Sequence, residues 1–121
     1  MANPSTTGSG TEVIRRFYYD GTGETLRSIL TVSANHIYIV KTLIICERNN
    51  HPDTSFTLDI DVDGSGTLIQ LVTEQTCGSK GTFIWDNVFV MSAGDILKFT
   101  AQSSGTGDYD IVGTYIDQDW S

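Results

Sequence analysis

The chain has 121 residues, 39% of them hydrophobic, and a formal net charge of −8, which fits one domain with one hydrophobic core. The acidic balance disfavours nucleic-acid binding, because phosphate backbones are themselves negative. No stretch approaches the roughly 18 apolar residues that a membrane span requires, and no basic segment leads into an apolar one at the N-terminus. We therefore expect a soluble protein, made in the cytoplasm without a signal peptide, that binds neither nucleic acid nor membranes.

The first ten residues, MANPSTTGSG, have no apolar pattern and are rich in Ser, Thr and Gly. We expect a flexible arm over residues 1–10 and a folded domain over residues 11–121. Residues 12–19 then carry apolar or aromatic side chains at both parities together with two arginines, which favours an edge strand with mixed faces. Leu26, Leu30 and Val32 alternate with polar residues and predict a half-buried strand.

The longest nearly uninterrupted apolar stretch is NHIYIVKTLIIC, residues 35–46, and it predicts a central strand. Its β-branched and aromatic side chains favour a pleated environment, and it has no polar stripe at helical spacing. Because apolar residues occur at both parities, we expect both faces of this strand to be covered over part of its length.

The second half of the chain continues with short alternating segments separated by turn residues. Residues 55–62 have the cleanest alternation, with a tight turn at 63–66 leading into a partner strand over 67–73, so we expect a β-hairpin. Further strands are predicted over 82–91, 96–101 and 109–116, followed by an acidic tail over 117–121. In the first of these hairpin strands we expect Phe56, Leu58, Ile60 and Val62 to face the core and Thr57, Asp59 and Asp61 to face solvent.

About eight short strands at this spacing predict an all-β fold, a single antiparallel β-sandwich with jelly-roll or Greek-key-like wiring. Trp85 and Phe89 are the expected anchors of its core. Cys46 and Cys77 are too few for the disulfide framework of a small secreted domain, so we expect free thiols, with a bridge between the two as the alternative.

Two short patterns are typical of metal sites. Asp59, Asp61 and Asp63 open a D-x-D-x-D-G pattern, in which three carboxylates converge on calcium. Gln70 stands where the pattern needs a bidentate Glu, and strand alternation also explains the acids, so calcium is the lesser alternative. His51 and Asp53 have the H-x-D spacing of iron-dependent jelly-roll oxygenases, but no later histidine completes that site.

No catalytic signature occurs in the chain, and we expect no metal, no cofactor and no enzymatic activity. One alternative to a structural role is glycan binding. An exposed Trp120, together with Tyr109, Tyr115 or Trp85, would provide a platform on which sugar rings stack.

Several segments together resemble small β-sandwich virion proteins of tailed bacteriophages. They are the strand IYIVKTLIIC at 37–46, the Asn49-Asn50 loop, the alternating strand at 56–62 and the segment MSAGDIL at 91–97. The resemblance covers about residues 30 to 116, and the chain departs from the family pattern at Glu47, where Asn is usual. It implies a structural protein of the virion and brings no catalytic residues with it.

Within that class, the compact domain, the arm and the acidity favour a capsid cement or decoration protein that binds the outer surface of the head and stabilises capsomer joints. Its expected partners are the major capsid protein and neighbouring copies of itself, with a homo-oligomer left open. The alternative is a neck, tail or fibre component. The residues that we expect to bind partners lie in the arm, the first strand and the tail: Asn3, Pro4, Thr6, Arg15, Arg16 and Trp120.

Overall fold

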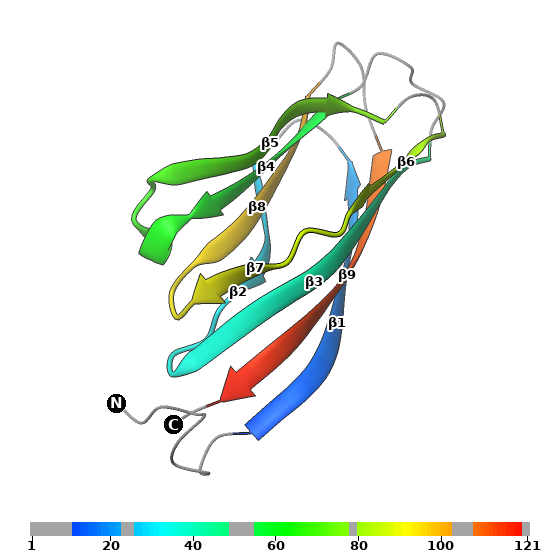
Figure 1. Cartoon of the computed structure of the whole chain (residues 1–121). Helices are drawn as coiled ribbons and strands as arrows, with labels where there is room; N and C mark the ends of the chain where they lie inside the picture. Colours follow the sequence, from blue (N-terminus) through cyan, green and yellow to red (C-terminus); the bar gives the residue numbers. More distant parts are fainter. Residues whose placement is uncertain (1–10, 23–25, 49–54, 78–79, 103–107, 120–121) are drawn as a thin grey trace.

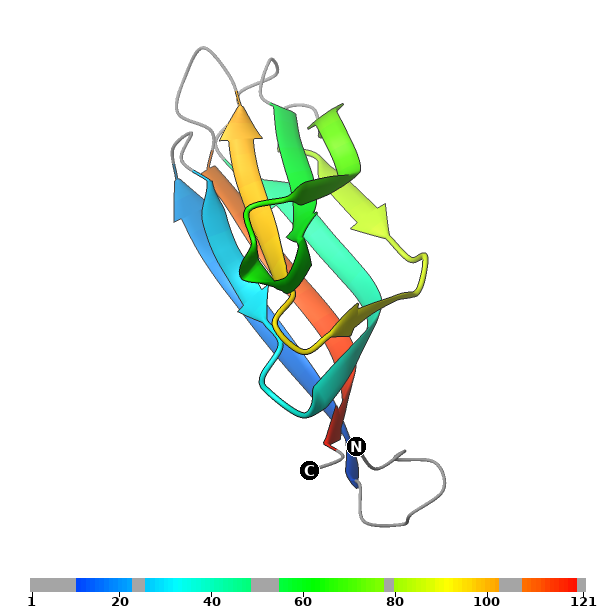
Figure 2. The same ribbon diagram turned by 90° about the vertical axis from the view of Figure 1, so that its left-hand side faces the viewer.

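A computed structural model describes residues 11–22, 26–48, 55–77, 80–102 and 108–119. These residues form two antiparallel sheets that pack face to face as a β-sandwich (Figures 1 and 2). No helix in this part of the chain is long and apolar enough to cross a membrane. The elements are β1 (Thr11–Thr22), β2 (Arg27–Thr31), β3 (His36–Glu47), β4 (Ser55–Asp61), the 3-10 turn η1 (Val62–Gly64), β5 (Leu68–Thr76), β6 (Thr82–Trp85), β7 (Phe89–Ser92), β8 (Ile96–Gln102) and β9 (Asp108–Asp119).

The strands of the two sheets are connected as in one long antiparallel hairpin that folds back on itself. Sheet A has the order β1-β9-β3-β6, with β7 also paired to β3, and sheet B has the order β2-β8-β4-β5. The antiparallel pairs nest along the chain, because β1 pairs with β9, β2 with β8, β3 with β6 and β7, and β4 with β5. Such nesting is the wiring of a jelly roll. The predicted all-β antiparallel sandwich is confirmed.

The apolar stretch at 35–46 is the central strand that its composition predicts. As β3 it pairs with β9 on one side and with β6 and β7 on the other, while β1 lies at the edge of the same sheet. Its register with β9 shifts between Val40 and Thr42, so that Lys41 is an extra residue in a β-bulge. The bulge keeps inward-facing side chains inward on both halves of a long strand.

The single strand predicted over residues 82–91 is two strands in the structure, which makes nine in the described chain. Trp85 pairs with Leu43 and Phe89 with Val40, so residues 86–88 loop out opposite the bulge of β3. Asp86 and Asn87 are poor strand formers, which explains the break. The indole Nε1 of Trp85 donates a hydrogen bond to the Asn87 carbonyl, 2.8 Å away, and closes the loop.

The core is centred on aromatic residues other than the predicted anchors. Trp85 and Phe89 are only partly buried and pack against its margin, so their prediction as anchors is wrong. Phe56 is fully buried, and its ring centroid lies 5.8 Å from those of both Phe99 and Tyr109. These three rings come from β4, β8 and β9 and therefore hold the two sheets together.

The alternation predicted for residues 55–62 holds for the core side and is wrong for the solvent side. Phe56 and Leu58 are fully buried between the sheets, whereas Val62 leaves the strand in η1 and is exposed. Asp59 and Asp61 lie on the other face of sheet B, yet they are only 4% and 3% exposed. The backbone of β5 and of the turn before it folds against that face, and it donates hydrogen bonds to Thr57 and Asp61. The Glu74 N–H donates to Thr57 Oγ1 at 3.0 Å, and the Gly66 N–H donates to Asp61 Oδ1 at 2.7 Å.

Candidate functional site

The outer face of sheet A, the side turned away from sheet B, is the most distinctive surface of the molecule (Figure 1). Successive side chains of a strand point to opposite faces. In β1, Phe17 is buried in the core, so Ile14, Arg16 and Tyr18 lie on the outer face. In β9 the buried residues include Ile111 and Tyr115, which places Val112, Thr114 and Ile116 on that same outer face.

The register of the four strands aligns the outward side chains into two apolar rows that cross the sheet. Each row takes one side chain from β1, one from β9, one from β3 and one from the β6–β7 edge. The first row is Ile14, Ile116, Ile39 and Val90, and the second row is Tyr18, Val112, Ile44 and Ile84.

The two apolar rows are exposed. Ile14 and Tyr18 are 75% and 76% exposed, and Ile44, Ile84, Val90 and Val112 are also exposed. Together these six side chains present on the order of 600 Å² of apolar surface, divided between the two rows. No described element lies over this face (Figure 1). Apolar rows that are exposed side by side on one sheet face favour a surface that another molecule covers.

The prediction that both faces of the central strand are covered is therefore wrong for the described chain. The inner residues of β3, including Val40 and Leu43, are fully buried, whereas Ile44 on the other face is exposed. Apolar residues at both parities give the same sequence pattern whether the second face is covered by the same chain or by a partner. The pattern thus becomes a sign of intermolecular contact once the fold is known.

A polar band separates the two apolar rows. It is formed by Arg16, Thr114 and Thr42, which are aligned across β1, β9 and β3, together with the exposed bulge residue Lys41. No described residue makes an ion pair with Arg16 or Lys41. The outer face therefore carries two uncompensated positive charges between its apolar rows.

The outer face of sheet B has the opposite character, since it is polar and largely satisfied within the chain. Lys98 Nζ lies 3.1 Å from Asp61 Oδ2, and the other oxygen of that carboxylate accepts the Gly66 N–H. These interactions lower the pKa of Asp61, with the Gly66 hydrogen bond as the larger cause. Of the two sheets, only sheet A presents an extended apolar outer face.

Asp59, beside Asp61 on β4, is a buried carboxylate whose environment has the opposite effect. Its Oδ1 has no hydrogen-bond partner among the described residues, and burial raises the pKa of this carboxyl group. A carboxyl group whose pKa is raised by folding, such as Asp59, stabilises the folded protein at pH values below the unfolded pKa of 3.8. This stabilisation is lost as the pH rises through the pKa of the folded state. A lowered pKa, as for Asp61, contributes stability at neutral pH that is lost as the pH falls.

We therefore expect Asp59→Asn to raise the melting temperature at pH 7, because the variant has no charge to desolvate at this site. The matched variant Asp61→Asn is expected to lower it, because it loses the ion pair with Lys98. Both differences should shrink when the melting series is repeated at pH 3, where the carboxyl of Asp59 is protonated. A destabilised Asp59→Asn variant at pH 7 would show that the carboxylate has a partner.

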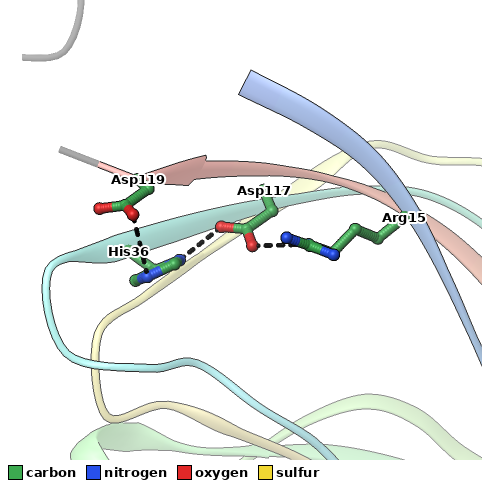
Figure 3. A network of polar contacts seen from close by, with 4 residues as sticks. All are labelled: Arg15, His36, Asp117 and Asp119. Atoms are coloured by element: carbon green, nitrogen blue, oxygen red, sulfur yellow. Dashed lines mark hydrogen bonds and ion pairs between the residues drawn. The ribbon is translucent and has the colours of Figure 1, made fainter. Parts of the chain in front are cut away.

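An ion network joins three strands at the end of sheet A where β1 begins (Figure 3). The buried Asp117 accepts a hydrogen bond from Arg15 Nε at 2.9 Å and another from His36 Nδ1 at 2.6 Å. His36 Nε2 also lies 3.8 Å from Asp119 Oδ2. The network ties β1 and β3 to β9. Burial raises the pKa of the nearby Tyr115, and the charges of Tyr38 and Asp117 add to the effect.

This network corrects one prediction. The residues from 117 were expected to form an acidic tail, but Asp117–Asp119 belong to β9 and Asp117 is buried. Ile111, Tyr115 and Asp117 all lie at odd-numbered positions of β9, so the alternation that places the first two in the core also predicts that Asp117 is buried. The guanidinium of Arg15 is engaged by Asp117 within the chain, but its side chain is half exposed, so its role in partner binding stays a prediction. Arg16 makes no ion pair with a described residue and is exposed on the outer face.

The metal alternatives gain no support from the geometry. Within the described ranges no group of three or more His, Cys, Asp or Glu side chains is placed to hold a metal ion. Asp61 is engaged by Lys98, and the Asp63 N–H donates to Asp95 Oδ1 at 2.9 Å, so η1 is organised by the turn between β7 and β8. His51 and Asp53 lie outside the described residues.

The sugar-stacking alternative loses two of the three residues that can be placed, whereas the third, Trp85, is partly buried. Tyr109 is fully buried and Tyr115 is nearly so, and neither ring forms an exposed platform. Trp120 lies outside the described residues, as do three of the predicted partner-binding residues, Asn3, Pro4 and Thr6.

Cys46 and Cys77 are free thiols in the structure. Burial raises the pKa of the Cys77 thiol to about 11, with further contributions from Cys46 and Glu47. Because the thiolate is the nucleophile, Cys77 is a poor one at neutral pH.

Comparisons with known proteins identify the fold. Neither a protein-family model nor a curated protein sequence matches the chain. A chain in the capsid structure of the Helicobacter pylori bacteriophage KHP30 aligns with a TM-score of 0.60 and 8% identity, over 88% of this chain and 92% of its own length. A chain in the structure of infectious bursal disease virus, Gt strain, aligns with a TM-score of 0.55 and 7% identity over 89% of this chain. The present chain spans only about a third, 32%, of that viral chain. At these identities the likeness establishes a shared sandwich fold.

Proposed function

We propose that this protein is a non-enzymatic structural component of a bacteriophage virion, a cement or decoration protein that binds the outer surface of the head and stabilises capsomer joints. The observation that carries the proposal is the exposed apolar outer face of sheet A. A protein that acts by attachment needs a rigid surface whose burial supplies binding energy, and a regular sheet with two aligned apolar rows is such a surface.

The fold supports a place in a virus particle. The sandwich is shared with chains in the KHP30 capsid and in infectious bursal disease virus, and the KHP30 chain is matched over nearly its whole length. The resemblance of residues 30 to 116 to virion proteins of tailed phages, found in sequence segments alone, points to the same class of protein.

Charge supports the outer surface of the head over its interior. The chain has a net charge of −8, and an acidic protein is repelled by packaged DNA. A stable protein interface buries roughly 800 Å² on each partner, and the outer face of sheet A supplies much of that area. In this proposal the arm at residues 1–10, with Asn3, Pro4 and Thr6, and Trp120 in the tail extend the contact to neighbouring subunits.

Quantitative mass spectrometry of gradient-purified particles from a phage that carries this gene tests the proposal. We expect the protein at a near-stoichiometric ratio to the major capsid protein, because a decoration protein occupies repeated sites. A few copies per particle would instead favour the alternative, a neck, tail or fibre component. Absence from purified particles would overturn the virion role altogether.

In the same assay, deletion of residues 1–10 should lower the copy number without lowering the melting temperature of the free protein.

A further inference from the structure

The polar band on the outer face of sheet A restricts what can cover that face. Arg16 and Lys41 lie on β1 and β3, with β9 between them, so their backbones are roughly 10 Å apart. The first apolar row lies on one side of the band and the second row on the other. A partner that covers both rows must also cover these two side chains.

Burial without a counter-charge is costly for both residues. A cation loses its hydration when a partner excludes water, and the loss is offset only by carboxylates or other acceptors placed opposite it. Within the described chain Arg16 and Lys41 have no ion-pair partner, unlike Arg15, Arg48 and Lys98, each of which pairs with an aspartate. The acceptors must therefore come from the partner.

A second copy of the same face does not meet this requirement. Two outer faces stacked about a two-fold axis that runs along the polar bands would bring Arg16 and Lys41 close to the same two cations of the other copy. Like charges in a desolvated contact are destabilising and discriminate against such a pairing. The acids of this face relieve it only in part. Glu12 lies beyond the first apolar row and accepts a hydrogen bond from Gln118, and Asp20 and Asp110 lie beyond the second row and are engaged by Arg48 at 2.7 and 3.5 Å. Asp86, exposed at the β6–β7 edge level with the band, lies opposite Arg16 when the strands of the two copies run in the same direction, but Lys41 then faces Thr114 and stays unpaired.

We propose that the outer face of sheet A docks on a different protein, on an apolar surface that presents carboxylates opposite Arg16 and Lys41. This inference rests on the proposed function for the identity of that partner, which is the shell protein of the head. The apolar rows supply the area of the contact, and the two charge pairs set its register and its specificity.

The test uses particles produced without this protein and the purified full chain, with bound and free protein separated by sedimentation. The double variant Arg16→Met, Lys41→Met keeps most of the unbranched aliphatic part of both side chains and removes their charges. It should weaken binding by about tenfold or more, because it leaves the partner's carboxylates buried and unpaired. The control Arg27→Met, Lys80→Met removes the same two charges from exposed positions outside this face and should change the dissociation constant by less than about twofold.

The outcomes separate this inference from the proposed function. If the wild-type chain binds and the Arg16→Met, Lys41→Met variant binds equally well or more tightly, the contact is purely apolar and the inference is wrong, while the virion role stands. If the wild-type chain does not bind the particles, the proposed function fails and the inference fails with it. Light scattering of the free protein gives a further check, because a dimer that Ile14→Glu dissociates would identify a second copy as the occupant.

Discussion

Replacement of Phe56 by Ala is expected to lower the free energy of unfolding by about 4 kcal/mol, the largest effect of any single substitution considered for this protein. Phe56 is fully buried, and its ring lies 5.3 Å from that of Phe83 and 5.8 Å from those of Phe99 and Tyr109. Loss of the ring removes contacts with both sheets and leaves a cavity that the surrounding strands cannot close.

A matched control for this substitution is Tyr18→Ala on the outer face of sheet A. Tyr18 is also aromatic, but it is 76% exposed in the free protein, so its removal should change the stability by less than about 0.5 kcal/mol. Urea denaturation of the two variants measures the difference. Equal losses would show that Tyr18 is packed in the free protein and that the outer face is covered before any partner binds.

Substitution of Gly113 by Ala is expected to cost about 3 kcal/mol, although it adds only one methyl group. Gly113 lies in the middle of β9, between β1 and β3, and faces the core. A Cβ atom at this position would overlap Phe17 Cε1 and lie 2.9 Å from Leu43 Cδ2, so either the ring or the strand must move. The glycine is thus required by the close approach of the Phe17 ring to β9.

A double-mutant cycle with Phe17→Leu identifies this cause. If the clash with the ring explains the loss, the cost of Gly113→Ala should be clearly smaller in a chain that already carries Phe17→Leu. Strictly additive losses would instead assign the role of Gly113 to the backbone of β9.

Period-two alternation in the sequence was sufficient to predict the sandwich. The apolar stretch at 35–46, the hairpin around residues 63–66 and the edge strand at the start of the domain lie where the pattern places them. These features are local, because alternation and turn chemistry are written into neighbouring residues. The split of residues 82–91 was missed because it depends on the bulge at Lys41 in another strand.

Burial was predicted less well than strand position. Alternation identifies the face of a sheet on which Asp59 and Asp61 lie, but not that the backbone of β5 folds over that face. Asp117 was assigned to a tail because the acidic residues after Ile116 give no sign of partners as distant in sequence as Arg15 and His36, although the alternation of β9 continues to Asp117. Contacts between distant segments determine both cases.

The candidate site was only partly predictable for the same reason. Arg16 was identified as a partner-binding residue, and it lies on the outer face of sheet A. Ile14, Ile84 and Val90 were not identified, because each lies in a short segment with mixed parity and their alignment arises only from the register of β1, β9, β3 and the β6–β7 edge. The excess of apolar residues in the central strand was the one available signal of an uncovered face.

Attachment of this protein to a phage head through the outer face of sheet A is tested most directly by a cryo-electron microscopy reconstruction of the particle that resolves side chains. We expect density for the sandwich on the outside of the head, with Tyr18 and Ile84 buried against the shell, carboxylates of the shell beside Arg16 and Lys41, and sheet B turned toward solvent. A sandwich whose sheet A faces solvent, or a head without this density, would contradict the proposal.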